Sequence, residues 1–293
     1  MTRDRASVAS YVQPLPKGIR QHIDRQPRPR DGDNLGLWLD KYLPLDPENF
    51  DLKAEERVRL LGDLFVARKL GRPVPWRSPA TAEAIARMRQ SCGLLYGEGG
   101  YRELRASVRG RLLIDYARLS TIESSLSFHA TLGVPRIPGS ALKGLLRATL
   151  RHQVSAERLE ELFGAPDLEE EGARGEHRRG RLVLHDALPD GAFQLDLDVL
   201  TPHFGDYYSD STGRTPPADW LSPSPTTFLT VVETTFVVFA GILPAFEGGD
   251  APRTPAATLL DEVQAALGEA LWEEGLGAKR AAAYGRLVIQ ETR

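Results

Sequence analysis

The chain has 293 residues, a formal net charge of −3 at pH 7, and 41% hydrophobic and 26% charged residues. These proportions are typical of a folded globular protein, so they exclude a largely disordered or fibrous chain. The length permits one large domain or two small ones, because a single core rarely grows beyond about 250 to 300 residues.

One cysteine and the lack of a long apolar run narrow the class further. Cys92 is the single cysteine, which excludes an internal disulfide and leaves zinc short of thiolate ligands, and the six histidines are scattered. The longest apolar run, over 231–243, contains Glu233 and falls short of the roughly 20 residues that span a bilayer. We therefore expect a cytoplasmic protein with no membrane partner, no metal and no cofactor.

The first 33 residues are rich in arginine and proline, and they predict a flexible basic arm over 1–33. Seven arginine or lysine residues between positions 3 and 30 outnumber two acidic ones, Asp4 and Asp24, whereas acidic residues cluster later, over 167–176. The arm is either a solvated tail or a contact for an acidic partner.

Helical periodicity follows over 34–110. Apolar residues recur at three- and four-residue spacing over 35–43 and 54–70, and 79–88 predicts another short helix after a proline-rich break. The segment 34–110 is therefore predicted to be a helical N-terminal addition.

From residue 111 the pattern changes to strands interspersed with helices. The expected order is a strand over 111–116, a loop over 120–138, a helix over 140–152, strands over 181–188 and 193–200 joined by a turn at 189–191, a long loop over 201–225, one strand or a bent pair over 228–243, a helix over 254–272 and a strand over 286–290. This order predicts an α+β, ferredoxin-like domain over 111–293. Its helices would cover one face of a sheet and leave the other open to RNA or partners.

The segment 137–147 predicts a capped amphipathic helix with a cationic edge. Pro138 and Gly139 make a turn, Ser140 supplies an N-cap, and the backbone N–H groups beyond it face outward where a phosphate could sit. Lys143, Arg147 and Arg151 follow at four-residue spacing, within an arc of roughly 80°. This stripe is either an RNA-backbone contact or an ordinary solvated face.

A glycine-rich loop over 275–285 is the second notable stretch. Its glycines permit positive φ and close approach of a ligand, and two cations add charge. The spacing fails the dinucleotide fingerprint, so the loop is either a binding element or a plain connection between a helix and a strand. The residues concerned are Gly275, Gly277, Lys279, Arg280, Tyr284 and Gly285.

Other patterns favour no catalytic class. Asp196 and Asp198 alternate along a predicted strand, as on its polar face, whereas a metal nuclease needs carboxylates that converge from several elements. His203 with Asp206 is similarly insufficient, and Ser140 lacks the Gly-x-Ser-x-Gly elbow of serine hydrolases.

Aromatic residues stand out in the long loop over 201–225. Tyr207, Tyr208 and Trp220 have rings that can stack on splayed bases or on another subunit, or can hold their own loop in place. The pattern leaves these alternatives open.

Two separated motifs make the sequence similar to a known family. Pro138-Gly139-Ser140-x-Leu142-Lys143-Gly144-x-x-Arg147, together with the C-terminal Gly275-x-Gly277-x-Lys279 loop that ends in Tyr284-Gly285, resembles the RAMP superfamily of CRISPR effector subunits. The segments 180–187 and 198–208 resemble in particular the family formed by the sixth subunit of type III-B Cmr complexes. The resemblance covers about residues 111–290.

The resemblance implies a modified ferredoxin-like (RRM-like) RAMP domain that binds RNA as a structural subunit, without catalysis. Its partners would be the guide (crRNA) and target RNA, near the 3′ end of the guide, and the other Cmr-type subunits, including the backbone RAMP subunit. It raises the expectation that Ser140, Lys143, Arg147, Arg151 and the residues of the 275–285 loop contact RNA.

A related RAMP branch implies one alternative, a metal-independent endoribonuclease that processes guide RNA. His129, in the loop before the motif helix, is then the candidate general base, and otherwise a structural or RNA-contacting residue. Tyr116, Tyr207 or Tyr208 could assist it, although nothing in the sequence brings them together.

Overall fold

The structure is a computed structural model that describes residues 19, 21, 28–43, 54–66, 68–69, 72–73, 75–116, 126–165, 179–201, 203–218, 220, 223, 225–244 and 254–290. Of the predicted basic arm, only residues 19, 21 and 28–33 fall within these ranges, and the acidic segment 167–176 lies outside them.

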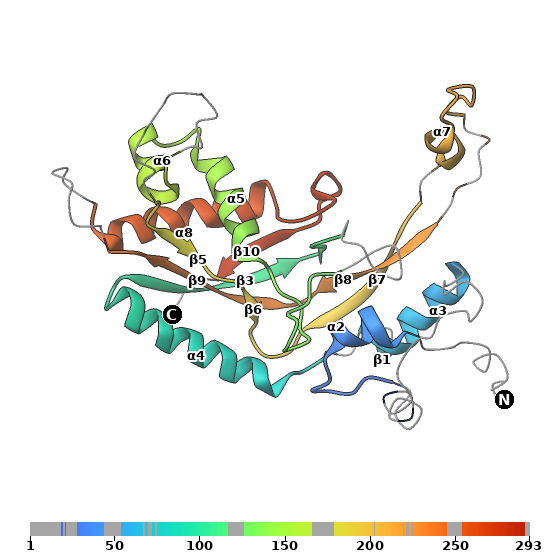
Figure 1. Ribbon diagram of the computed structural model, residues 1–293, viewed down its shortest axis with the longest axis horizontal. Helices are drawn as coiled ribbons and strands as arrows, with labels where there is room; N and C mark the ends of the chain where they lie inside the picture. The colour runs from blue at the N-terminus through green and yellow to red at the C-terminus, as the bar shows by residue number, and fades with distance from the viewer. Residues whose placement is uncertain are drawn as a thin grey trace.

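The described chain combines helices with antiparallel strands (Figure 1). The helices are α2 (Leu35–Leu37), the π-helical turn η2 (Trp38–Tyr42), α3 (Ala54–Phe65), α4 (Pro79–Tyr96), α5 (Gly139–Leu150), α6 (Ala156–Phe163), α7 (Gly205–Ser209), α8 (Ala256–Glu273) and the 3-10 turn η3 (Arg280–Ala282). The strands are β1 (Arg68–Lys69), β2 (Arg72–Pro73), β3 (Tyr101–Arg109), β4 (Arg111–Leu112), β5 (Leu182–Leu184), β6 (Leu188–Pro189), β7 (Gln194–Leu200), β8 (Thr226–Val232), β9 (Thr235–Ile242) and β10 (Arg286–Gln290).

The main sheet has the strand order β10-β3-β9-β5, and β6 also pairs with β9. β3 pairs with β9 and with β10 along its length, for example Leu104 with Val238 and Val108 with Leu287. This strand lies within the segment 34–110 that was predicted to be a helical addition, so the sheet begins earlier in the chain than residue 111. Leu104, Ala106 and Val108 are buried on one face of this strand, whereas Glu103, Arg105 and Ser107 on the other face are half-buried.

Helices cover both faces of the main sheet, which corrects the expectation of an open face. Figure 1 shows α5 and α8 on one face and α4 on the other. Adjacent residues of β3 point to opposite layers: Arg102 pairs with Asp261 of α8, whereas Glu103 pairs with Arg89 of α4. α4 is thus a layer of the domain, and it runs eight residues beyond the short helix predicted over 79–88.

The predicted hairpin between 181–188 and 193–200 does not form. β5 and β6 pair with β9, whereas β7 pairs with β8 in a second sheet of order β4-β8-β7. The turn at 189–191, where Gly191 has φ 89°, passes the chain from one sheet to the other. The run 228–243 is the bent pair, because Glu233 at φ 43° separates β8 from β9.

Sequence periodicity located the last two elements closely. β10 has the predicted bounds, and α8 buries the predicted stripe Leu260, Val263, Leu267 and Leu271 against the main sheet. Burial of such a stripe is the main source of stability for an amphipathic helix. None of the described helices combines the length and the hydropathy needed to cross a membrane.

β7 and β8 extend as a ribbon beyond the body of the protein and carry α7 near its end (Figure 1). The base of the ribbon is anchored by Phe193, Leu195 and Val231, the β8 partner of Leu195, which are all buried. Toward the outer end Val199 is 47% exposed, so the apolar side of the ribbon is uncovered there. The long loop predicted over 201–225 is therefore the end of a projecting arm.

Candidate nucleic-acid interface

The start of α5 differs from the capped helix that was predicted. The helix begins at Gly139, Pro138 holds the N-cap position, and the exposed Ser140 makes no side-chain cap. Instead the Asp186 carboxylate accepts a hydrogen bond from the Gly139 N–H at 2.8 Å and pairs with Arg136 at 2.5 Å. The helix N-terminus that was expected to face a phosphate is thus occupied by a carboxylate of the protein itself. Asp186 accepts the N–H of the first helical residue, and its negative charge interacts favourably with the positive end of the helix dipole.

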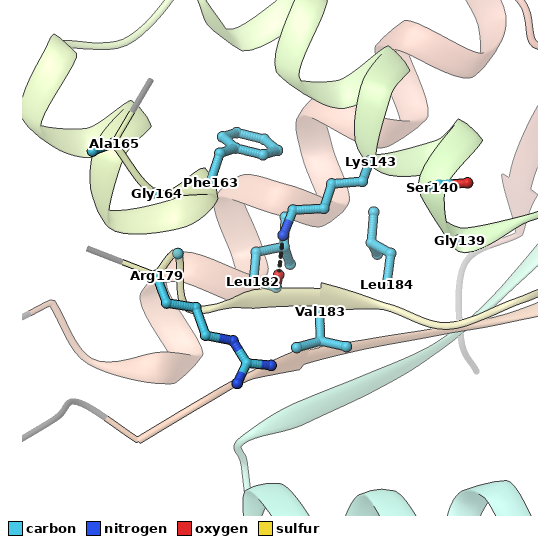
Figure 2. A pocket seen from close by; sticks show the side chains of 11 residues that line it. Gly139, Ser140, Lys143, Phe163, Gly164, Ala165, Arg179, Leu182, Val183 and Leu184 are labelled. Carbon is cyan, nitrogen blue, oxygen red and sulfur yellow. Dashed lines mark hydrogen bonds between the residues drawn. The ribbon is translucent and has the colours of Figure 1, made fainter. Parts of the chain in front are cut away.

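Lys143 points toward the edge of the main sheet. Its Nζ donates to the Leu182 carbonyl oxygen at 2.7 Å and lies 5.9 Å from the centre of the Phe163 ring (Figure 2). Burial lowers the pKa of the Lys143 ammonium, and repulsion from Arg179 and Arg147 lowers it further. Lys143 is therefore part of a cationic group that reaches from α5 to β5.

Lys143, Phe163 and Leu182 line a pocket of about 480 Å³ between α5, the end of α6 and strand β5. Figure 2 shows Lys143 crossing it from α5, with Phe163 on one side and the β5 backbone on the other. Arg179, which was not among the predicted site residues, is exposed and also lines the pocket. No sequence pattern indicated Arg179, because it lies outside both motifs.

Arg147 and Arg151 continue along α5 as predicted, and both are exposed. Arg151 is the C-cap residue, and its Nε donates to His152 Nε2 at 2.8 Å. The predicted stripe therefore divides into a half-buried lysine at the sheet edge and two arginines at the surface.

The glycine-rich loop is folded tightly onto the end of the second sheet. Leu276 N–H donates to Gly285 O at 2.8 Å, and Gly285 N–H donates to Arg111 O at 2.7 Å. Gly277 at φ 87° and Gly285 at φ 74° are required here, because a Cβ would collide with the Leu113 carbonyl oxygen and the Leu276 carbonyl oxygen respectively. Gly275, at φ 73°, ends the helical segment.

Two of the predicted loop contacts are engaged inside the protein. Lys279 Nζ lies 4.7 Å from the centre of the Phe228 ring and 4.8 Å from that of Tyr284, a cation–π sandwich. The Tyr284 hydroxyl donates to Asp198 Oδ2, whose carboxylate also pairs with Arg111 at 3.2 Å. Arg280, by contrast, is exposed and remains available to a ligand.

Charge and burial set the ionisation of this network. Burial raises the pKa of Tyr284 to about 12, aided by its hydrogen bond to Asp198. Burial opposes ionisation of Asp198, but the Tyr284 hydroxyl, the Val199 N–H and Arg111 outweigh it and hold the pKa of that carboxyl below its usual range. Arg111 also pairs with Asp196 at 3.0 Å, so both aspartates of β7 form ion pairs with this arginine.

His129 holds a tight turn. Its Nδ1 accepts the Leu132 N–H at 3.3 Å and lies 3.2 Å from Thr131 Oγ1. The tyrosines proposed to assist it lie on other elements: Tyr116 packs edge-on against Phe228 of β8, and Tyr207 and Tyr208 belong to α7. No contact in the described chain brings them to His129.

One hydrogen bond links the two motif segments. Thr149 Oγ1, in the last turn of α5, donates to Glu274 Oε1 at 2.6 Å, next to Gly275. α5 and the glycine-rich loop are thus neighbours, while His129 is held elsewhere, beside Asn34, whose side chain donates to Ala130 O at 2.6 Å.

Among the described residues, the projecting arm carries the two most exposed aromatic rings. Trp220 is 81% exposed and Tyr208 76%, and Tyr208 lies edge-on to Tyr207 with 5.3 Å between ring centres. Exposed aromatic rings of this kind can stack on unpaired bases or pack against another protein.

Comparisons with known proteins agree with the motifs. The chain is 30% identical over 236 residues to CRISPR system Cmr subunit Cmr6 of Pyrococcus furiosus, which covers 61% of this chain and 65% of that protein. It is 29% identical over 105 residues to CRISPR system CMR subunit Cmr6 of Saccharolobus solfataricus, over 35% of this chain and 34% of that protein. The chain thus spans less than two thirds of the length of either relative.

A solved structure shares the fold. A chain of the cryo-EM structure of the type III-B Cmr-beta bound to cognate target RNA superposes with a TM-score of 0.54 at 20% identity, covering 73% of this chain and 66% of that one. Residues 94–288 match the family model of the RAMP superfamily, and this range includes β3, which the sequence motifs alone had left out. The chain therefore belongs to the RAMP superfamily.

Proposed function

We propose that this protein is a structural, non-catalytic RNA-binding subunit of a type III-B CRISPR (Cmr) effector complex in the cytoplasm, located near the 3′ end of the guide RNA. The observation that carries the proposal is the 30% identity over 236 residues to the Cmr6 subunit of Pyrococcus furiosus. Guide and target RNA, the backbone RAMP subunit and the other Cmr subunits are the proposed partners.

The distribution of charge supports an RNA contact on part of the surface. Arg147, Arg151 and Arg280 are exposed, and α5 and the glycine-rich loop are neighbours through Thr149 and Glu274. Cations placed in this way bind the phosphate backbone without reading sequence.

The aromatic arm supports a second contact. Tyr208 and Trp220 are mostly exposed on a ribbon that extends away from the sheets. Aromatic rings stack on unpaired bases with little dependence on sequence, which suits a subunit that must accept many guides.

Assembly with the partners is the test. The net charge of −3 predicts weak RNA binding by the isolated chain, so guide retention should depend on the complex. The chain is co-expressed with the other Cmr subunits and a guide RNA. The purified complex is then assayed for the presence of this chain and for the amount of guide RNA retained. We expect co-purification, with guide retention reduced by Arg147→Gln/Arg151→Gln and unchanged by Arg87→Gln on the outer side of α4. Failure to co-purify would overturn the proposal.

The endoribonuclease alternative is decided by a cleavage assay. The purified chain is incubated with guide-precursor RNA in EDTA, beside a His129→Ala variant. We expect no specific cleavage by either protein, since the His129 ring is engaged in its own turn. Specific cleavage that His129→Ala abolishes would replace the structural proposal.

A further inference from the structure

The projecting arm is held by the body of the protein at two rungs of its ribbon. Asp198 of β7 is paired in register with Phe228 of β8, and Asp196 is paired with Thr230 two residues further in. Residues two apart on a strand share a face, so all four side chains lie on one side of the ribbon. At the next rung on this side Leu200 is 36% exposed, and the arm extends away from the body (Figure 1). The direction of the arm on this side is therefore set at the two inner rungs.

The glycine-rich loop contacts both strands at the rung of Asp198 and Phe228. The Tyr284 hydroxyl donates to Asp198 of β7, and Arg111 pairs with the same carboxylate at 3.2 Å. Lys279 Nζ lies 4.7 Å from the centre of the Phe228 ring of β8. Lys279 also lies over the Tyr284 ring, 4.8 Å from its centre, so these two side chains support each other while each holds one strand. The loop thus bridges the two strands where the arm begins.

The backbone of the loop links these contacts to an exposed cation. Lys279 at φ 58° and Ala283 at φ 61° stand on either side of the turn η3, in left-handed conformations that residues other than glycine rarely adopt. Such conformations persist where surrounding contacts hold them, and Lys279 is held by two rings. Arg280, the next residue, is exposed. The contacts that hold the arm therefore also fix where Arg280 is presented.

The surroundings of Lys279 favour this internal role over a contact with RNA. Its ammonium lies between two rings, and the hydroxyl of one of them is bonded to the Asp198 carboxylate. A phosphate that approached Lys279 would therefore approach an aspartate as well, and like charges repel. Resting on the proposed RNA-binding function, we infer that Lys279 and Tyr284 are positioning residues that fix the direction of the projecting arm. They thereby set the distance between Arg280 and the aromatic rings at the end of the arm, which is the distance that a bound RNA would span.

The first test measures the direction of the arm in the full chain without RNA. Nitroxide labels on Ser211→Cys in the arm and Ala265→Cys on α8, both exposed positions, report a distance distribution by electron–electron double resonance, and the native Cys92 is buried. We expect Lys279→Gln to raise the fraction of molecules outside the main distance about three- to thirtyfold, the factor equivalent to one cation–π contact. Lys279→Arg, which keeps a cation between the rings, should restore the wild-type distribution, and the surface control Arg87→Gln should leave it unchanged.

The second test measures RNA retention in the complex assembled from this chain, the other Cmr subunits and a guide RNA. We expect Lys279→Gln to lower the amount of RNA retained and Lys279→Arg to restore it. Tyr284→Phe removes only the hydroxyl that binds Asp198. It should broaden the distance distribution and lower retention in the same direction, so the inference does not depend on one variant that could fail to fold.

The two measurements together separate the possible failures. An unchanged distance distribution in both Lys279→Gln and Tyr284→Phe would overturn the inference. If Lys279→Gln then still lowered RNA retention, Lys279 would be a direct phosphate contact instead. If the distribution broadens while RNA retention is unchanged, the two residues do position the arm, and it is the proposed contact of the arm with RNA that fails.

Discussion

The Asp186 carboxylate accepts a hydrogen bond at 2.8 Å from the N–H of Gly139, the first residue of α5, although the two residues are 47 positions apart. It pairs with Arg136 through its other oxygen. One side chain thus joins the segment after β5 to the start of the motif helix. Because α5 packs closely against β5 here, Gly139 lies against the Leu184 carbonyl and Lys143 reaches the Leu182 carbonyl oxygen.

Removal of that cap should destabilise the fold. Asp186→Ala should lower the free energy of unfolding by about 1 to 2 kcal/mol, because the Gly139 N–H and Arg136 lose their shared acceptor. Urea denaturation measures the change. The matched control is Asp190→Ala, which removes a similarly exposed ion pair with Arg105 but no contact with a helix N-terminus, and should cost less than about 1 kcal/mol. Equal losses in the two variants would argue against the cap.

The two glycines of the motif helix should respond in opposite directions to alanine. A Cβ at Gly139 would collide with the Leu184 carbonyl oxygen, whereas nothing lies within 4 Å of a Cβ at Gly144. Gly144→Ala should stabilise the protein by about 0.5 to 1 kcal/mol, the usual gain in a helix interior, while Gly139→Ala should destabilise it. Thermal unfolding distinguishes them, and stabilisation by Gly139→Ala would contradict the close contact of α5 with β5.

Ionisation of Tyr284 should lower the free energy of unfolding at alkaline pH. Its pKa is raised to about 12, chiefly by burial and then by Asp198, so the folded state holds this proton more tightly than the unfolded chain does. The contribution is fully present below about pH 10 and is lost as the pH rises toward 12. We expect Tyr284→Phe to remove this component, with a difference from wild type of about 1 kcal/mol below pH 10.

The measurement is the unfolding free energy of both proteins between pH 8 and 11, with Tyr208→Phe as the control on an exposed ring. The difference between wild type and Tyr284→Phe should shrink as the pH rises. A difference that stays constant across this range would mean that the pKa of Tyr284 is not raised in the folded protein.

The aromatic arm should matter for binding and not for stability. Trp220→Ala and Tyr208→Ala should change the free energy of unfolding by less than about 0.5 kcal/mol, because both rings are mostly exposed. In the assembled complex each should weaken RNA retention, by about 1 to 3 kcal/mol if the ring stacks on a base. Trp272→Ala, which removes a half-exposed indole from α8, is the control. Unchanged RNA retention together with loss of a Cmr subunit would reassign the arm to a protein contact.

The sequence alone determined the elements whose pattern is local. The stripe Leu260, Val263, Leu267 and Leu271 specifies a helix, and the apolar run at the C-terminus specifies β10, because both depend on spacing within a few turns or residues. The glycine-rich loop was similarly evident, since positive φ at Gly277 and Gly285 requires glycine there. Two such motifs in order sufficed to indicate the family.

Tertiary structure decided where those elements and their charges face. β5 and β7 are close in sequence yet belong to different sheets, and α4 covers a sheet face that no local pattern assigned to it. The pattern placed Lys143 on the same cationic edge as Arg147, but only the packing of α5 on β5 turns Lys143 to the Leu182 carbonyl. Spacing fixes which side of a helix a residue occupies, whereas its partner depends on chain segments that folding brings together from far away.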